Sequence, residues 1–201
     1  MRLIFTFLIT LILSFQTSGQ NAWCQKTYDI NFDDMNCMDG LIIDTVHLSN
    51  NIWQIGQPQK NTFDSAYSAD NVIITDTTNT YPASNISTFY IGHVTPGTEG
   101  LYDAIFSGYY QSETDSLKDF GNIEVANNTS IHNNPNWIDL LNDNTFSDEI
   151  VWHTPKPTLT GSTEGWQYFS VSLGLLFHAI GDSYEDTIVF KFTFTSDSIA
   201  D

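Results

Sequence analysis

The sequence predicts an all-β fold, a two-sheet antiparallel sandwich, and three observations lead to it. In the segment 187–195, Phe190, Phe192 and Phe194 alternate with polar residues, which is the period of a strand with one buried face. The chain has only 6 Lys and Arg but 14 Phe and 9 Tyr, a composition typical of strands joined by polar loops. Turn-forming pairs such as Pro96-Gly97 and Asn127-Asn128 separate the apolar runs.

The expected strands are short runs rich in β-branched and aromatic residues. In chain order they span 28–32, 71–75, 88–91, 101–110, 122–125, 150–153, 167–173 and 187–195. Only the segment 175–180 is compatible with a helix, and a glycine on each side limits that helix to one or two turns. No internal repeat or interior linker interrupts this series, so we expect one domain over residues 21–201.

The first 20 residues have the layout of a signal peptide. Arg2 precedes an apolar run of about ten residues, and a small polar stretch follows from Ser14 to Gly19. A membrane anchor is the alternative, but roughly 20 apolar residues are needed to span the bilayer core. We therefore expect a secreted protein, extracellular or on the cell surface, with no membrane span after cleavage.

The acidic balance of the chain excludes two classes of partner. Its 24 Asp and Glu against 6 Lys and Arg give a net charge of -18, which becomes -19 when Arg2, the only charged residue of 1–20, is removed. Nucleic acid and anionic lipid surfaces would be repelled. The acids are mostly Asp, which is typical of turns and cation sites.

Cys24 and Cys37 are the two cysteines of the sequence. In an oxidising compartment, an even count predicts one disulfide, which would contribute about 3 kcal/mol by closing a short loop. A metal site is the alternative, but no His lies near either thiol in the sequence.

Several motifs in order carry a family resemblance. They are Phe32-Asp33-Asp34, Trp53-Gln54-Ile55-Gly56-Gln57-Pro58, the segments 63–68 and 121–126, Trp166-Gln167-Tyr168, and the phenylalanine strand ending in Thr195-Ser196-Asp197. This series resembles the MAM-like (meprin-type) and galactose-binding-like jelly-roll domains of secreted Bacteroidetes proteins. The resemblance implies a jelly-roll fold and a module for adhesion or glycan contact.

The chain departs from this pattern at its C-terminal end. Members of the family usually continue into a further strand of the form Gly-Trp-x-Ile-Asp-Asp, whereas this chain stops at Asp201. Either the sandwich is completed differently or it lacks its final strand. In the second case the phenylalanine strand would expose an edge.

The resemblance also implies one structural calcium ion near the first strand. Hard cations take six to eight oxygen ligands, and the family often holds a cation close to its Phe-Asp segment. The residues that it would bring together are Asp33, Asp34, Asp64, Asp70 and Asn71. The alternative is that these are solvated loop residues.

Four aromatic residues near loops or strand ends are the candidate ligand-binding residues. They are Trp137, Trp152, Tyr109 and Tyr110. An aromatic ring can lie against the apolar face of a sugar, although burial in the core is the competing role for each ring. Trp53 and Trp166 fall in the framework motifs, so we expect them to pack in the core or at its edge.

The sequence gives no catalytic motif. The five His are scattered, without the i, i+4 spacing of a helical zinc site, and there is no Gly-x-Ser-x-Gly elbow. A glycosidase needs only two carboxylates, which Glu124 with Glu149 or Asp103 could supply. We expect a non-catalytic module that binds an extracellular glycan or surface protein. The alternatives are a structural accessory domain without a ligand and a secreted glycoside hydrolase.

Overall fold

The regular secondary structure of the described residues is almost entirely antiparallel β-sheet. The computed structural model describes residues 30, 32–34, 40–68, 70–94, 104–127, 135–180 and 187–199. Its elements are β1 (Leu41–Ile43), β2 (Trp53–Gly56), β3 (Val72–Thr75), β4 (Ile86–Val94), β5 (Ile105–Tyr110), β6 (Phe120–Asn127), β7 (Ile138–Asp139), β8 (Val151–Trp152), β9 (Gln167–Ser172), α3 (Gly174–Ala179) and β10 (Thr187–Thr195). None of the helical structure in these ranges is long and apolar enough to cross a membrane.

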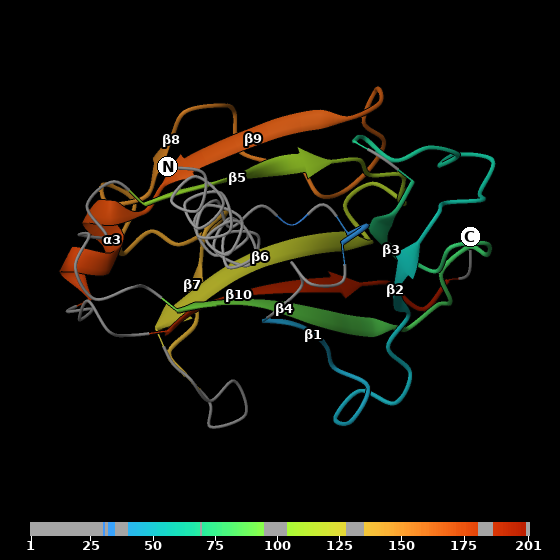
Figure 1. Cartoon of the computed structure of the whole chain (residues 1–201), viewed down its shortest axis with the longest axis horizontal. Coiled ribbons are helices and arrows are strands. Elements are labelled where there is room, and N and C mark those ends of the chain that lie inside the picture. Colours follow the sequence, from blue (N-terminus) through green and yellow to red (C-terminus); the bar gives the residue numbers. More distant parts are fainter. Residues whose placement is uncertain are drawn as a thin grey trace, which may run out of the picture.

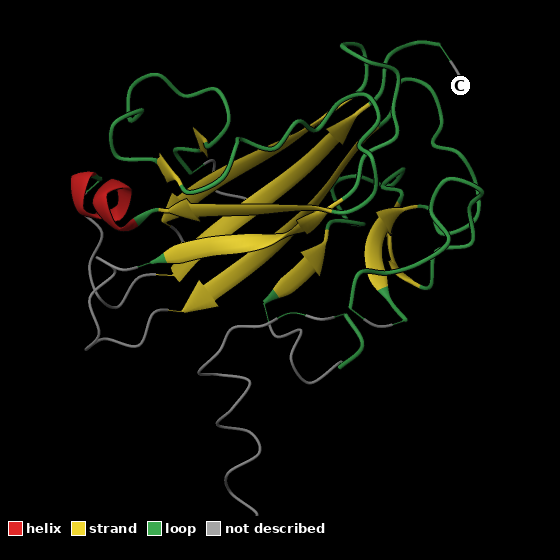
Figure 2. Ribbon diagram, turned by 90° about the horizontal axis from the view of Figure 1, so that it is seen from above, coloured by secondary structure: helices red, strands yellow, loops and turns green. Residues whose placement is uncertain are grey.

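The strands form three sheets (Figure 1). The largest sheet has five strands in the order β1-β4-β10-β6-β7, a second has the order β5-β9-β8, and β2 pairs with β3 alone. Figure 2 shows α3 at one end of the larger sheets and the β2–β3 pair at the other. The expectation of an all-β fold with antiparallel sheets is therefore confirmed.

β10 lies in the centre of the five-stranded sheet. It pairs along its length with β4 on one side and with β6 on the other. Of the two alternatives that the sequence left open, an exposed edge at this strand is therefore excluded. The reason is that β6, which precedes β10 by some sixty residues, occupies the position beside it.

The core lies between the five-stranded and three-stranded sheets. The rings of Phe106 on β5 and Phe190 on β10 stack with their centroids 4.1 Å apart. Phe192 stacks on Phe89 at 4.5 Å, and Phe194 meets the edge of Tyr81 at 4.8 Å. The predicted inward orientation of the three phenylalanines is thus confirmed. Burial of such rings is the main stabilising term of a sandwich core.

The expected elements correspond closely to the observed ones. The segment 187–195 matches β10 to the residue, and 71–75, 88–91, 122–125, 150–153 and 167–173 each contain or lie within a strand. β5 occupies the second half of 101–110, and the expected short helix is α3. The expected strand 28–32 lies largely outside the described residues. The signal peptide 1–20, Cys24 and Cys37 lie outside them entirely.

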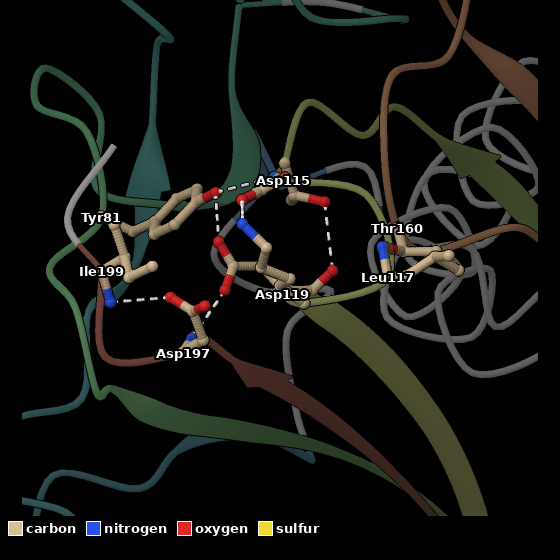
Figure 3. A network of polar contacts seen from close by, with 9 residues as sticks. Tyr81, Asp115, Leu117, Asp119, Thr160, Asp197 and Ile199 are labelled. Atoms are coloured by element: carbon tan, nitrogen blue, oxygen red, sulfur yellow. Dashed lines mark hydrogen bonds and ion pairs between the residues drawn. The ribbon is translucent and has the colours of Figure 1, made fainter.

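A buried carboxylate fixes the loops near the end of β10 (Figure 3). The side chain of Asp119 is 0 % exposed. It accepts a hydrogen bond from the Tyr81 hydroxyl at 2.7 Å and one from the Asp197 backbone N–H at 2.6 Å. The backbone continues the network. Asp119 N–H donates to the Asp115 carbonyl at 3.0 Å, and Leu117 N–H donates to the Thr160 hydroxyl at 2.8 Å. Four segments distant in sequence are thereby joined.

Candidate functional site: an exposed tyrosine cluster

The three-stranded sheet is unusual for an acidic protein because its strands contain no charged residue. Their sequences are IFSGYY for β5, VW for β8 and QYFSVS for β9. Solvent-facing strand positions normally carry polar or charged side chains. The outer face of this sheet is therefore the first place to look for a binding surface.

Alternation along β5 and β9 directs two tyrosines outward. On β5, Phe106 faces the core, whereas Tyr109 is exposed. On β9, Phe169 is buried and Tyr168 is exposed. The register places Tyr109 directly opposite Tyr168, with ring centroids 5.1 Å apart. Cross-strand aromatic pairs of this kind contribute about 0.2–1 kcal/mol.

A glycine on the inner side of β5 helps to keep this geometry. A Cβ atom at Gly108 would lie 3.2 Å from Cε1 of Phe169, closer than ordinary contact. Gly108 therefore gives the Phe169 ring room beneath β5. The neighbouring Tyr109 side chain takes the opposite side of the strand.

Two more rings complete a group that we call the tyrosine cluster, consisting of Tyr67, Tyr109, Tyr168 and Trp166. Tyr67 comes from the long β2–β3 connection, which passes beside the end of β5 and the start of β9 (Figure 1). Its ring stacks on Tyr109 with centroids 3.5 Å apart and planes at 15°. Trp166, just before β9, meets Tyr67 in an edge-to-face contact at 6.2 Å.

The tyrosines of the cluster remain about half exposed. The exposed fractions are 51 % for Tyr67, 44 % for Tyr109 and 48 % for Tyr168. A hydrogen bond with the Tyr67 side chain raises the pKa of Tyr109 above its ordinary value. The cluster thus presents aromatic surface and an uncharged Tyr109 hydroxyl to solvent at neutral pH. Such a surface can stack against an apolar ligand face and hydrogen bond at its rim.

Trp137 lies on the other large sheet and covers an ion pair. The Nζ atom of Lys191 lies 4.5 Å from the centroid of the Trp137 ring and 2.5 Å from a carboxylate oxygen of Glu124. Lys191 and Glu124 are 18 % and 19 % exposed. Burial raises the pKa of the adjacent Tyr90, and the negative charges of Asp44 and Glu124 raise it further. One face of the Trp137 ring is thus already occupied by a cation.

Trp152 and Tyr110 point inward. Trp152 packs against the hydrophobic core, and its Nε1–H is buried with no hydrogen-bond partner among the described residues. Tyr110 lies on the inner side of β5, and its hydroxyl accepts a hydrogen bond from Thr158 N–H at 3.2 Å. Of the four predicted ligand-binding residues, the structure therefore places only Tyr109 in the exposed cluster.

Of the carboxylates considered for a hydrolase, Glu124 is held by a structural contact. Glu124 forms the ion pair with Lys191, and its opposite neighbour on β7 is Asp139. The Asp139 carboxylate accepts hydrogen bonds from Leu141 N–H at 2.8 Å and Asn142 N–H at 3.0 Å, which closes a turn. Glu149 lies in a separate turn before β8, and Asp103 lies outside the described residues.

Only part of the predicted calcium set is brought together. Asn71 N–H donates to a carboxylate oxygen of Asp33 at 3.0 Å. Asp64 accepts a hydrogen bond from its neighbour Ser65 at 3.2 Å, and Asp70 is exposed. The described ranges, which include Asp34, contain no group of three His, Cys, Asp or Glu side chains that could hold a metal ion. The calcium ion at these residues therefore stays a prediction.

Tyr67, Tyr168 and Trp166 were not among the predicted binding residues. A signal for Tyr168 exists in the sequence, since Tyr168, Ser170 and Ser172 alternate with the apolar Phe169, Val171 and Leu173. No local pattern identifies Tyr67, because it lies in an irregular connection. Trp166 was expected to pack in the core or at its edge; it is half-buried, its Nε1 atom is buried, and its ring meets Tyr67.

Comparisons of the chain with protein-family models, with curated proteins and with solved structures found no match. The likeness to MAM-like jelly-roll domains therefore depends on the sequence motifs alone. The function must be argued from the geometry of the chain itself.

Proposed function

We propose that this protein is a secreted, non-catalytic module that binds an extracellular saccharide through the tyrosine cluster. The observation that carries the proposal is the half-exposed ring group on a sheet without charged residues. Soluble proteins rarely leave several aromatic rings together in solvent unless the surface meets a partner. Rings of this kind stack on the apolar faces of sugars while their hydroxyls bond to sugar hydroxyls.

The rest of the proposal draws on the sequence. The signal-peptide layout of residues 1–20 supports export, and the motif series supports a MAM-like jelly-roll, a fold associated with adhesion. The antiparallel five- and three-stranded sheets are compatible with that fold. A surface protein bearing glycans would be engaged by the same face.

Binding should depend on the outward tyrosines and not on exposed apolar residues elsewhere. The purified protein is screened against a panel of soluble and immobilised polysaccharides. The variants are Tyr109→Ala and Tyr168→Ala, and the matched control is Val46→Ala, a residue that is 85 % exposed in a loop beyond β1. Covering roughly 50 Å² of ring surface contributes ~1.3 kcal/mol, so each tyrosine variant should weaken binding about tenfold.

The fluorescence of the protein provides a second measurement. Because Trp166 contacts Tyr67, saccharide binding should change tryptophan emission, and Trp166→Phe should remove most of that change. Circular dichroism of each variant establishes that the fold is retained. Unchanged affinity in both folded tyrosine variants would show that the cluster is not the binding site.

A further inference from the structure

The charges around the tyrosine cluster bear on which class of saccharide it can take, an inference that rests on the proposed function. Saccharides of the extracellular space are either neutral or made anionic by uronate and sulfate groups. An anionic saccharide needs cationic side chains to offset its charge. The supply of such side chains in this chain is very small, with 6 Lys and Arg in total.

Every lysine in the described ranges already has a partner. Lys60 Nζ donates to the Thr75 carbonyl, Lys118 pairs with Asp115, Lys156 donates to the Leu141 carbonyl, and Lys191 pairs with Glu124. Arg2 and Lys26 are outside the described residues. None of these four lysines belongs to β5, β8 or β9. An anionic ligand on the cluster would therefore find no cation on the sheet beneath it.

The charged residues that follow the cluster along the chain are acidic. The exposed Glu113 lies three residues after the end of β5, and the exposed Glu164 lies shortly before Trp166 and the start of β9. Glu113 accepts a hydrogen bond from the Ser162 hydroxyl at 2.6 Å, which ties these two connections together. Carboxylates here repel uronate and sulfate groups.

We propose that the tyrosine cluster selects neutral saccharides and discriminates against uronate- and sulfate-bearing ones. The rings supply stacking, and the Tyr109 hydroxyl supplies a polar atom among them. Selection comes from the absence of charge on the sheet together with acidic residues at its end. The binding affinity should depend on ionic strength only for the anionic ligands.

The test compares the full-length secreted protein on neutral and anionic probes by affinity electrophoresis and calorimetry. The neutral probes are xylan, mannan and cello-oligosaccharides, and the anionic probes are polygalacturonate, alginate and chondroitin sulfate. We expect binding to at least one neutral probe, with an affinity that is unchanged between about 20 mM and about 500 mM NaCl. We expect no binding to the anionic probes at the lower salt concentration.

Charge reversal provides the positive test. The double variant Glu113→Lys and Glu164→Lys should bind an anionic probe at low salt while its affinity for the neutral probe stays within about twofold. The control Asp148→Lys changes the net charge at an exposed loop before β8 and should not gain that binding.

Two results would overturn the inference, and they are distinguishable. If the unmodified protein binds an anionic probe at low salt as tightly as a neutral one, the selectivity is refuted while saccharide binding stands. If the folded protein binds no saccharide of either kind, the proposed function fails and the inference fails with it.

Discussion

Removal of one hydroxyl from the buried network around Asp119 should measurably destabilise the protein. The Tyr81 hydroxyl donates to a carboxylate oxygen of Asp119 at 2.7 Å, and the Asp119 side chain is fully buried. In Tyr81→Phe that oxygen loses its donor, whereas the ring contact with Phe194 is retained. A hydrogen bond to a charged group contributes about 1.5–3 kcal/mol, so we expect a loss of about 2 kcal/mol. For a domain of this size, such a loss lowers Tm by about 4 to 8 °C.

Urea unfolding followed by tryptophan fluorescence measures this free energy of unfolding, with thermal scans as a check. Tyr168→Phe is the matched control, because its hydroxyl belongs to a side chain that is 48 % exposed, and its stability should change by less than about 0.5 kcal/mol. In an Asp119→Ala background, the effect of Tyr81→Phe should largely disappear, since the two groups act as a pair. Equal stability of Tyr81→Phe and the unmodified protein would refute the argument that this network joins the loops.

Two further predictions concern the packing of the core and the free energy of unfolding at acidic pH. Phe190→Ala removes a ring stacked between the two sheets and should cost about 3–5 kcal/mol in urea unfolding; a loss below ~1 kcal/mol would contradict its placement in the core. At Asp44, burial opposes ionisation, but hydrogen bonds and the charge of His47 outweigh it and lower the pKa below 3.8. The ionised Asp44 therefore stabilises the fold above its unfolded-state pKa, and this contribution is lost as the pH falls through the folded-state value. The stability difference between the unmodified protein and Asp44→Asn should stay constant above about pH 5 and narrow as the pH falls below 3.8. A difference that does not change with pH would show that Asp44 does not titrate in this way.

The strongest alternation in the sequence predicted its strand accurately, whereas the short strands β1 and β7 were not predicted. β10 was expected over the same residues that form it, because three phenylalanines at every second position leave one buried face. β1 has three residues and β7 has two, too few to show a period. Such strands are defined by hydrogen bonds to β4 and β6 more than by their own residues.

The order of strands in a sheet is a different kind of information. Local patterns gave the position of β10 in the chain but not its neighbours. The resemblance to MAM-like domains left open whether this strand would lie at an exposed edge. The structure pairs β10 with β4 and β6, which are separated from it by roughly 60 to 100 residues of chain. Pairing over such distances depends on the packing of the whole core and leaves no signal in any one segment.

The same limit applies to the candidate site. Tyr109 was predicted as a ligand-binding residue, and alternation on β9 could have added Tyr168. The stacking of Tyr67 on Tyr109 could not be predicted, because it brings a loop residue onto a strand forty residues further along the chain. For Trp152, the sequence could not separate a core ring from a surface ring, since aromatic residues serve both roles.

The outer faces of the two larger sheets carry different kinds of side chains, and this difference favours a binding role for one of the sheets. On the five-stranded sheet, Lys191 lies between Tyr90 and Glu124 in the register, and Trp137 covers the ion pair from outside. The polar groups of that face therefore satisfy one another within the chain. On the three-stranded sheet, the Tyr109 ring packs against the rings of Tyr67 and Tyr168, and Tyr109 and Tyr168 remain about half exposed. In a chain with 24 acidic residues, charges would have been the simplest way to keep such a surface soluble. Their absence from all three strands is the observation that supports the proposed binding of a ligand with apolar faces and uncharged polar edges.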